Sequence, residues 1–251
     1  MLWGRETQSE ISRAPAAVPD GVRVYAIGDI HGRADLLDRQ HDLIEADVAA
    51  GCPSSVHLIY LGDYVDRGPD SRGVIERLAR TPRNGVTVTR LRGNHEEILL
   101  RFLKDPSVGP AWRQLGGMAT LLSYDVDVGK ILAKDGYPGL LASFQERLPP
   151  HHLKILSELT DSFVVGDYFF CHAGVRPGIP LEKQNRQDLT WIRDEFLTAT
   201  EDFGKMIVHG HTPVVEPDFR KNRIDIDTGA YATGRLTCLV LEGSTRRILS
   251  T

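Results

Sequence analysis

The sequence is poor in cysteine and has no excess of basic charge. Its three cysteines, Cys52, Cys171 and Cys238, are too widely spaced for a zinc-finger pattern, and three thiols cannot all pair. We therefore expect buried free thiols in a reducing compartment. The chain has 30 basic and 34 acidic side chains, which is not the basic balance of a protein that binds nucleic acid. No nucleic-acid partner is expected.

The sequence also lacks long apolar runs. None approaches the length of a membrane-spanning helix, and residues 1–20 have no hydrophobic segment typical of a signal peptide. We expect no membrane partner and a cytoplasmic location. Residues 1–20 are polar and contain proline, which predicts a flexible tail. The hydrophobic fraction of 41% is ordinary for a globular protein, and residues 21–251 are expected to form a single domain.

One pattern occurs three times in the first hundred residues: an apolar run, a short polar segment and then helical periodicity. The apolar runs span residues 22–27, 56–61 and 86–91. Three such units in succession predict β-α-β crossovers and a mostly parallel sheet. Ligands bind beyond the carboxyl ends of parallel strands, so the three polar segments should meet along one edge.

Residues from about 97 to 160 have a helical pattern interrupted by prolines, which predicts a helical insertion beside that edge. Strand patterns then resume with a hairpin over 162–171, turning at Gly166-Asp167. Shorter apolar runs follow at 206–208, 223–226 and 235–241. The order predicts an α/β fold with two sheets or one large mixed sheet. The late hairpin favours a β-sandwich of two mixed sheets flanked by helices.

Side chains that can bind metal ions gather where the predicted strands end. They are Asp29, His31, Asp63, Asp66, Asn94, His95, His172, His209 and His211. Carboxylates, imidazoles and an amide, with no thiolate, suit Mn, Fe or Zn in a catalytic site rather than a structural zinc site. These donors are too many for one ion that keeps an open position, which favours two ions sharing a carboxylate.

Five segments carry a resemblance to a known family. They are Gly28-Asp29-Ile30-His31-Gly32, Gly62-Asp63-Tyr64-Val65-Asp66-Arg67-Gly68, Gly93-Asn94-His95-Glu96, His172-Ala173-Gly174 and Gly210-His211-Thr212-Pro213. In this order they resemble the signature of the phosphoprotein phosphatase family of metallophosphoesterases. The nearest likeness is to its bacterial and bacteriophage-lambda-type serine/threonine phosphatases. The resemblance runs from about residue 22 to 242 and implies a metallophosphoesterase catalytic domain.

The resemblance implies two divalent ions, Mn first and Fe or Zn as alternatives. The implied ligands are Asp29 and His31 for the first ion, Asp63 bridging both, and Asn94, His172 and His211 for the second. His209 has no matching role, and we expect it to pack beside the ligands as an orienting partner.

The same resemblance implies the catalytic residues. Arg67, Arg193 and Asn94 would bind the phosphate, with Arg193 matched only through Trp191-Ile192-Arg193. A water bridging the two ions would attack phosphorus directly. His95 would protonate the leaving alkoxide as a general acid, kept protonated by Asp66.

The sequence predicts one leading function and leaves one alternative of the same superfamily. The first is a metal-dependent phosphomonoesterase acting on phosphorylated proteins, on serine and threonine first and tyrosine second, or on small phosphoesters. The alternative is hydrolysis of dinucleoside polyphosphates such as diadenosine tetraphosphate, or of capped RNA ends. Asp66 favours the first function, because relatives of the second kind usually carry another residue there. A binding module without turnover fits less well, since every ligand position holds a ligand-competent side chain.

Overall fold

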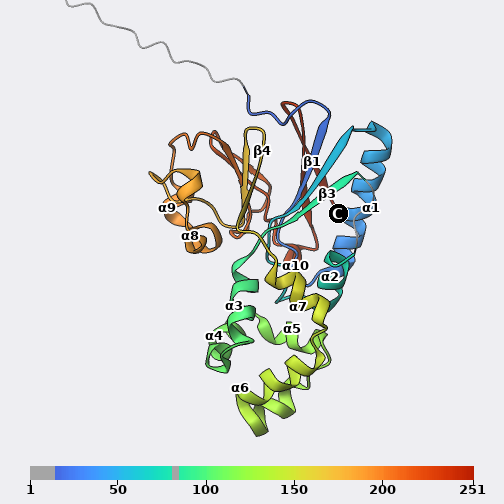
Figure 1. The fold of residues 1–251 in the computed structure, drawn as a ribbon, viewed down its shortest axis with the longest axis vertical. Helices are drawn as coiled ribbons and strands as arrows, with labels where there is room; N and C mark the ends of the chain where they lie inside the picture. The colour runs from blue at the N-terminus through green and yellow to red at the C-terminus, as the bar shows by residue number, and fades with distance from the viewer. Residues whose placement is uncertain (1–14, 81–84) are drawn as a thin grey trace, which may run out of the picture.

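The computed structural model describes residues 15–80 and 85–251. Their strands form two five-stranded sheets that pack into a sandwich, with helices on the outside and beyond one end (Figure 1). This confirms the predicted α/β fold of two mixed sheets flanked by helices.

The first sheet has the strand order β10-β9-β1-β2-β3. Strands β1, β2 and β3 are parallel, as the repeated pattern predicts, while β9 and β10 are antiparallel additions beside β1. The bounds are β1 Val22–Ile27, β2 Ser55–Tyr60, β3 Val86–Arg90, β9 Thr237–Glu242 and β10 Thr245–Ser250.

The second sheet has the order β4-β5-β6-β8-β7. Its predicted hairpin, β4 and β5, is antiparallel, whereas β5, β6 and β8 are parallel. The bounds are β4 Ser162–Val165, β5 Tyr168–Cys171, β6 Met206–His209, β7 Asp218–Phe219 and β8 Arg223–Asp225.

Alternation along the strands divides the apolar side chains into layers. Val24 and Ala26 of β1 face Phe170 and Val208 of the second sheet and form the interior of the sandwich. Tyr25 and the other outward-facing residues of the first sheet pack under helices. Helices α1 (Ala34–Gly51) and α2 (Ser71–Leu78) cover that outer face, and α8 (Arg186–Trp191) and α9 (Asp194–Leu197) cover the second sheet.

A helical region extends beyond the strand ends (Figure 1). It comprises α3 (Asn94–Phe102), α4 (Gly109–Gln114), α5 (Gly117–Ser123), α6 (Val128–Arg147) and α7 (Pro150–Ser157). The chain leaves the first sheet at Leu91 and returns beside it, where Leu91 and Thr160 form a bridge. The sequence predicts a helical insertion beside the strand ends over about 97–160, and in the structure the helices of this region run from Asn94 to Ser157. The short helix α10 (Ala230–Thr233) lies near the same end.

The predicted flexible tail needs a correction at its inner end. Residues 1–14 lie outside the described residues. Residues 15–18 are held between the two sheets: the Ala17 amide donates to Asp167 of the β4–β5 turn (3.1 Å), and the Val18 amide donates to Gly243 of the β9–β10 turn (3.0 Å). Val18 is buried. The polar, proline-containing composition predicted a tail, because composition does not reveal which distant groups accept hydrogen bonds from these backbone amides.

Two further expectations can be compared with the described residues. All three cysteines are free, but only Cys171 and Cys238 are buried; Cys52 is exposed because it caps the end of α1 at the surface. Within residues 15–80 and 85–251, no helix combines the length and apolar character needed to cross a membrane.

Candidate metal centre

The loops that follow five strands meet at one end of the sandwich. The loop after β1 is tied to the loop after β2, because the amide of His31 donates to the carbonyl of Asp63 (2.8 Å). The loops after β5 and β6 are tied likewise, since the amide of Gly210 donates to His172 (2.8 Å). The backbone therefore brings side chains from both sheets to one place, as the strand-end rule predicts.

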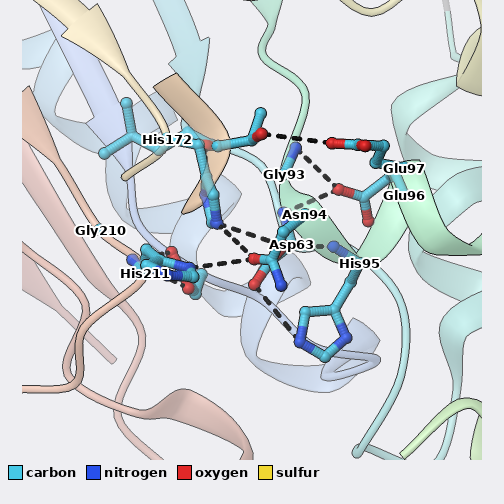
Figure 2. Close-up of polar contacts among 12 residues, drawn as sticks. Asp63, Gly93, Asn94, His95, Glu96, Glu97, His172, Gly210 and His211 are labelled. Carbon is cyan, nitrogen blue, oxygen red and sulfur yellow. Dashed lines mark hydrogen bonds and ion pairs between the residues drawn. The ribbon is translucent and has the colours of Figure 1, made fainter. Parts of the chain in front are cut away.

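Asp63 lies at the middle of these side chains. Its Oδ2 is 3.5 Å from Nε2 of His31, and its Oδ1 is 3.4 Å from Nε2 of His172. The rings of His172 and His95 point toward this carboxylate (Figure 2). Two groups with ligand atoms within 4.8 Å of one another can each hold an ion, and Asp63 belongs to both. The groups are His31, Asp63 and His95, and Asp63, His172 and His211.

Asn94 and Asp29 complete the predicted set. Oδ1 of Asn94 lies 3.0 Å from Nε2 of His172 and 3.0 Å from Nδ1 of His211. The backbone amide of His211 approaches both carboxylate oxygens of Asp29, at 3.3 and 3.2 Å. All six predicted ligands are buried, none more than 5% exposed. The structure thus brings every predicted ligand to one site.

The donor chemistry fits divalent cations. Burial lowers the pKa of His31 to about 3, so its ring is neutral. The neutral ring donates Nδ1–H to the carbonyl of Val65 (2.8 Å), which leaves the Nε2 lone pair facing the Asp63 carboxylate. Burial, Asp227 and Asp63 raise the pKa of Asp29 well above its usual range. Buried acceptors facing buried acceptors are costly unless a cation lies between them.

Glu96 organises the loop that carries Asp63, a role that the sequence analysis did not assign. Its carboxylate accepts amide hydrogen bonds from Gly93 (3.0 Å), Asp63 (2.9 Å), Tyr64 (2.8 Å) and Val65 (3.2 Å). The same loop has left-handed backbone at Asp63 (φ 51°), which a non-glycine residue adopts only when its surroundings enforce it. A glutamate at the third position of a helix, as in a capping box, was the available signal.

Asp66 and His95 form a buried pair next to the ligands. Oδ2 of Asp66 is 2.7 Å from Nδ1 of His95, and neither residue is more than 1% exposed. Burial by itself lowers the pKa of His95, but Asp63 and Asp66 outweigh it and raise that pKa above its usual value. The arrangement suits an imidazole that holds a proton beside the site.

Two helical residues that the sequence analysis missed fix Asp66 in place. The indole N–H of Trp112, on α4, donates to Oδ2 of Asp66 (2.9 Å), and the hydroxyl of Thr120, on α5, donates to Oδ1 (2.6 Å). All three side chains are fully buried. No motif marked Trp112 or Thr120, because neither lies near a strand end.

The two predicted phosphate-binding arginines flank the ligands. Nη2 of Arg67 is 3.4 Å from Nε2 of His95, and its guanidinium lies over the ring of Tyr231, 4.8 Å from the centroid. Arg193 donates from Nε to Nε2 of His211 (3.0 Å). His209 is buried against Phe196, with ring centroids 4.9 Å apart, and lies 3.8 Å from Asp225. This places His209 in a packed environment, while an orienting contact to a ligand stays a prediction.

Comparisons with known proteins find relatives of this chain by sequence and by overall fold. The model of the calcineurin-like phosphoesterases (Metallophos) matches residues 22–232. The chain is 28% identical over 236 residues to the asymmetrical bis(5′-nucleosyl)-tetraphosphatase PrpE of Bacillus cereus strain AH820, covering 85% of this chain and 88% of that protein. A solved candidate diadenosine tetraphosphatase superposes with a TM-score of 0.58 at 23% identity, over 95% of this chain and 98% of that chain. A mutant cold-active protein tyrosine phosphatase gives 0.54 at 18% identity, over 93% and 83%. The two structural likenesses support the fold alone.

Proposed function

The chain belongs to the calcineurin-like phosphoesterase family, and we propose that it is a cytoplasmic metallohydrolase of dinucleoside tetraphosphates. The observation that carries the chemistry is the position of the Asp63 carboxylate, with one oxygen 3.5 Å from Nε2 of His31 and the other 3.4 Å from Nε2 of His172. The substrate class is supported by the likeness to bis(5′-nucleosyl)-tetraphosphatases along 85% of the chain. We propose residues 21–251 as one catalytic domain with small phosphoesters as its partners.

The six predicted ligands would hold two divalent ions. They are Asp29, His31, Asp63, Asn94, His172 and His211. Bound there, the ions would supply Lewis acidity that lowers the pKa of water and neutralises charge on phosphoryl oxygens. The protein's part is to keep the ligands fixed: His31 and His172 each have Nδ1 next to a backbone carbonyl, of Val65 (2.8 Å) and Leu61 (3.0 Å), which sets the ring orientation.

Arg67 and Arg193 would bind the phosphoryl group from two sides of the ligand set. Each guanidinium already lies beside a ring of the site, His95 for Arg67 and His211 for Arg193. A guanidinium can donate two parallel hydrogen bonds to phosphate oxygens, and it keeps its charge at any physiological pH. Asn94 would contribute a side-chain contact to the same group.

The Asp66–His95 pair favours a second candidate function, hydrolysis of phosphoserine and phosphothreonine in proteins. An alkoxide leaving group needs a proton, and His95 holds one next to the ligands with Asp66 at 2.7 Å. A nucleotide leaves as a stabilised phosphate anion and needs the proton less. We propose with it the likeness to lambda-type phosphatases that the five sequence motifs imply, of which this pair is one part.

One experiment separates the two functions. Initial rates are measured with diadenosine tetraphosphate, a phosphoserine peptide and a phosphotyrosine peptide at equal Mn²⁺, and nucleotide products are resolved by chromatography. Asymmetrical hydrolysis adds water to one phosphoanhydride bond and yields ATP and AMP in equal amounts. We expect that product pair, at the highest kcat/KM of the three substrates, and none in EDTA. Faster phosphate release from the phosphoserine peptide would establish the second candidate instead.

A further inference from the structure

A second group of ligand-type side chains lies away from Asp63. Glu76 is on α2, and His151 and His152 are at the start of α7, the helix packed beside α2 (Figure 1). Nε2 of His151 is 3.0 Å and Nε2 of His152 is 2.9 Å from the same oxygen, Oε2 of Glu76. Ligand atoms of these three residues all lie within 4.8 Å of one another. They come from helices separated by about seventy residues of sequence, so their meeting is a product of the fold.

A contact on the far side of the His152 ring orients that ring toward Glu76. His152 is fully buried, and its Nδ1 is 2.8 Å from the hydroxyl of Tyr124. When that hydroxyl accepts the Nδ1–H, the lone pair of Nε2 points to Glu76, as in histidine ligands held by an outer partner. The buried ring of His152 is thus fixed through Nδ1, while its Nε2 is directed at Glu76.

We propose that Glu76, His151 and His152 bind a divalent transition-metal ion, Zn²⁺ above all, separately from the Asp63 centre. Two imidazole nitrogens and one carboxylate oxygen form a borderline donor set that suits Zn²⁺, and three protein ligands leave a fourth position for water. Glu76 and His151 are each 54% exposed in their side chains, which gives the ion a path from solvent.

Through α2, the ion would connect the helical region to the loop that carries Asp66. Helix α2 begins at Ser71, whose hydroxyl accepts the amide hydrogen of Asp66 (3.0 Å), and Asp70 caps the helix by accepting from Gly73 (2.7 Å). An ion joining Glu76 to α7 would restrain α2 against the helical region. Because an ion that binds only the folded state raises its stability, Zn²⁺ should raise the melting temperature through this site.

The test counts ions in chelator-stripped full-length protein. Zn²⁺ per chain is measured by equilibrium dialysis and elemental analysis for wild type, His151→Ala and Glu76→Gln, with Lys154→Ala and Glu158→Gln as matched controls on or next to α7. We expect His151→Ala and Glu76→Gln each to bind one Zn²⁺ fewer than wild type, and both controls to bind as wild type does. The two altered side chains are half-exposed, so the variants should fold, which circular dichroism checks.

Equal Zn²⁺ stoichiometry in all five proteins would overturn the proposal and leave Glu76 as a hydrogen-bond acceptor only. Melting curves give a second readout: the Zn²⁺-dependent rise in Tm should shrink in His151→Ala and persist in Lys154→Ala. Because each value is a difference from wild type, ions at Asp63 cancel, and the result does not depend on the function proposed for that centre.

Discussion

Asp63 and Asp66 lie three residues apart on the loop after β2, yet they face different regions of the molecule. Asp63 is surrounded by side chains from strand ends, such as His31 and His172. Asp66 is held by Trp112 and Thr120 of the helical region. The first set is arranged by sheet topology, and the second by the packing of helices against the loop. The comparison indicates that the sheets assemble the candidate ligands, while the helices fix the carboxylate that contacts His95, the predicted proton donor.

The largest effect should come from Asp63→Asn. The substitution replaces the carboxylate that lies between His31 and His172 with a neutral amide, so metal binding on both sides of residue 63 should be lost and hydrolysis should fall to background. Metal content and rate are measured on the same sample. Asp66→Asn serves as the control, and it should keep the metals. If Asp63→Asn still held two ions tightly, metal binding would not depend on Asp63, and Asp63 would not differ from Asp66 in this respect.

His95→Asn should have the next largest effect, and only on some substrates. Losing a general acid costs about 10²–10⁴-fold in rate when the leaving group needs a proton. We therefore expect a large fall in kcat for a phosphoserine peptide, a much smaller one for p-nitrophenyl phosphate, and unchanged metal content. If both esters slow equally, His95 does not act as an acid.

Trp112→Phe and Thr120→Val should give smaller losses of the same kind. Each removes one hydrogen bond to Asp66, and misplacing a catalytic group costs about tenfold to a hundredfold. The effect should appear in kcat for poor leaving groups rather than in metal content. In an Asp66→Asn background the same changes should add almost nothing, because the three groups act as one unit. Additive losses would show that the helices act on the site by another route.

Arg72→Ala should have the smallest effect. Arg72 pairs with Asp125 at 2.9 Å between α2 and the helical region, but both side chains are exposed, at 46% and 82%. Exposed pairs contribute about 0–1 kcal/mol to stability, so the midpoint of urea unfolding and kcat should change little. A marked loss of activity would mean that surface contacts, and not only Trp112 and Thr120, position the helices.

Most strands of the two sheets were predictable because each is an apolar run that ends in a short polar segment or turn. The first strand and the hairpin have the predicted bounds, β2 is shifted by one residue from its prediction at both ends, and β3 ends one residue earlier. Strand β7, Asp218–Phe219, was not predicted, since two residues carry no periodicity. Its pairing with β8 depends on tertiary structure.

The candidate site also has a part that was predictable from sequence motifs and a part that was not. The six predicted ligands converge because each directly follows a strand or a loop fixed by strands, so a local motif is enough to place it. Trp112 and Thr120 lie 46 and 54 residues from Asp66, in helices whose packing no local pattern specifies. Glu96 is intermediate: it stands inside a motif, but its bonds to the Asp63 loop span more than thirty residues. Roles that depend on long-range contacts were therefore the ones missed.

The segment at residues 15–18 has a practical consequence for handling the protein. It crosses between the β4–β5 and β9–β10 turns, and it precedes β1, whose opposite end leads to Asp29. A fusion partner or a solid support attached upstream of Pro15 would therefore extend from the face of the molecule remote from the ligands. Immobilised in that orientation, the protein would turn its strand-end loops toward the surrounding liquid, whereas a C-terminal tether would depart from the edge strand β10.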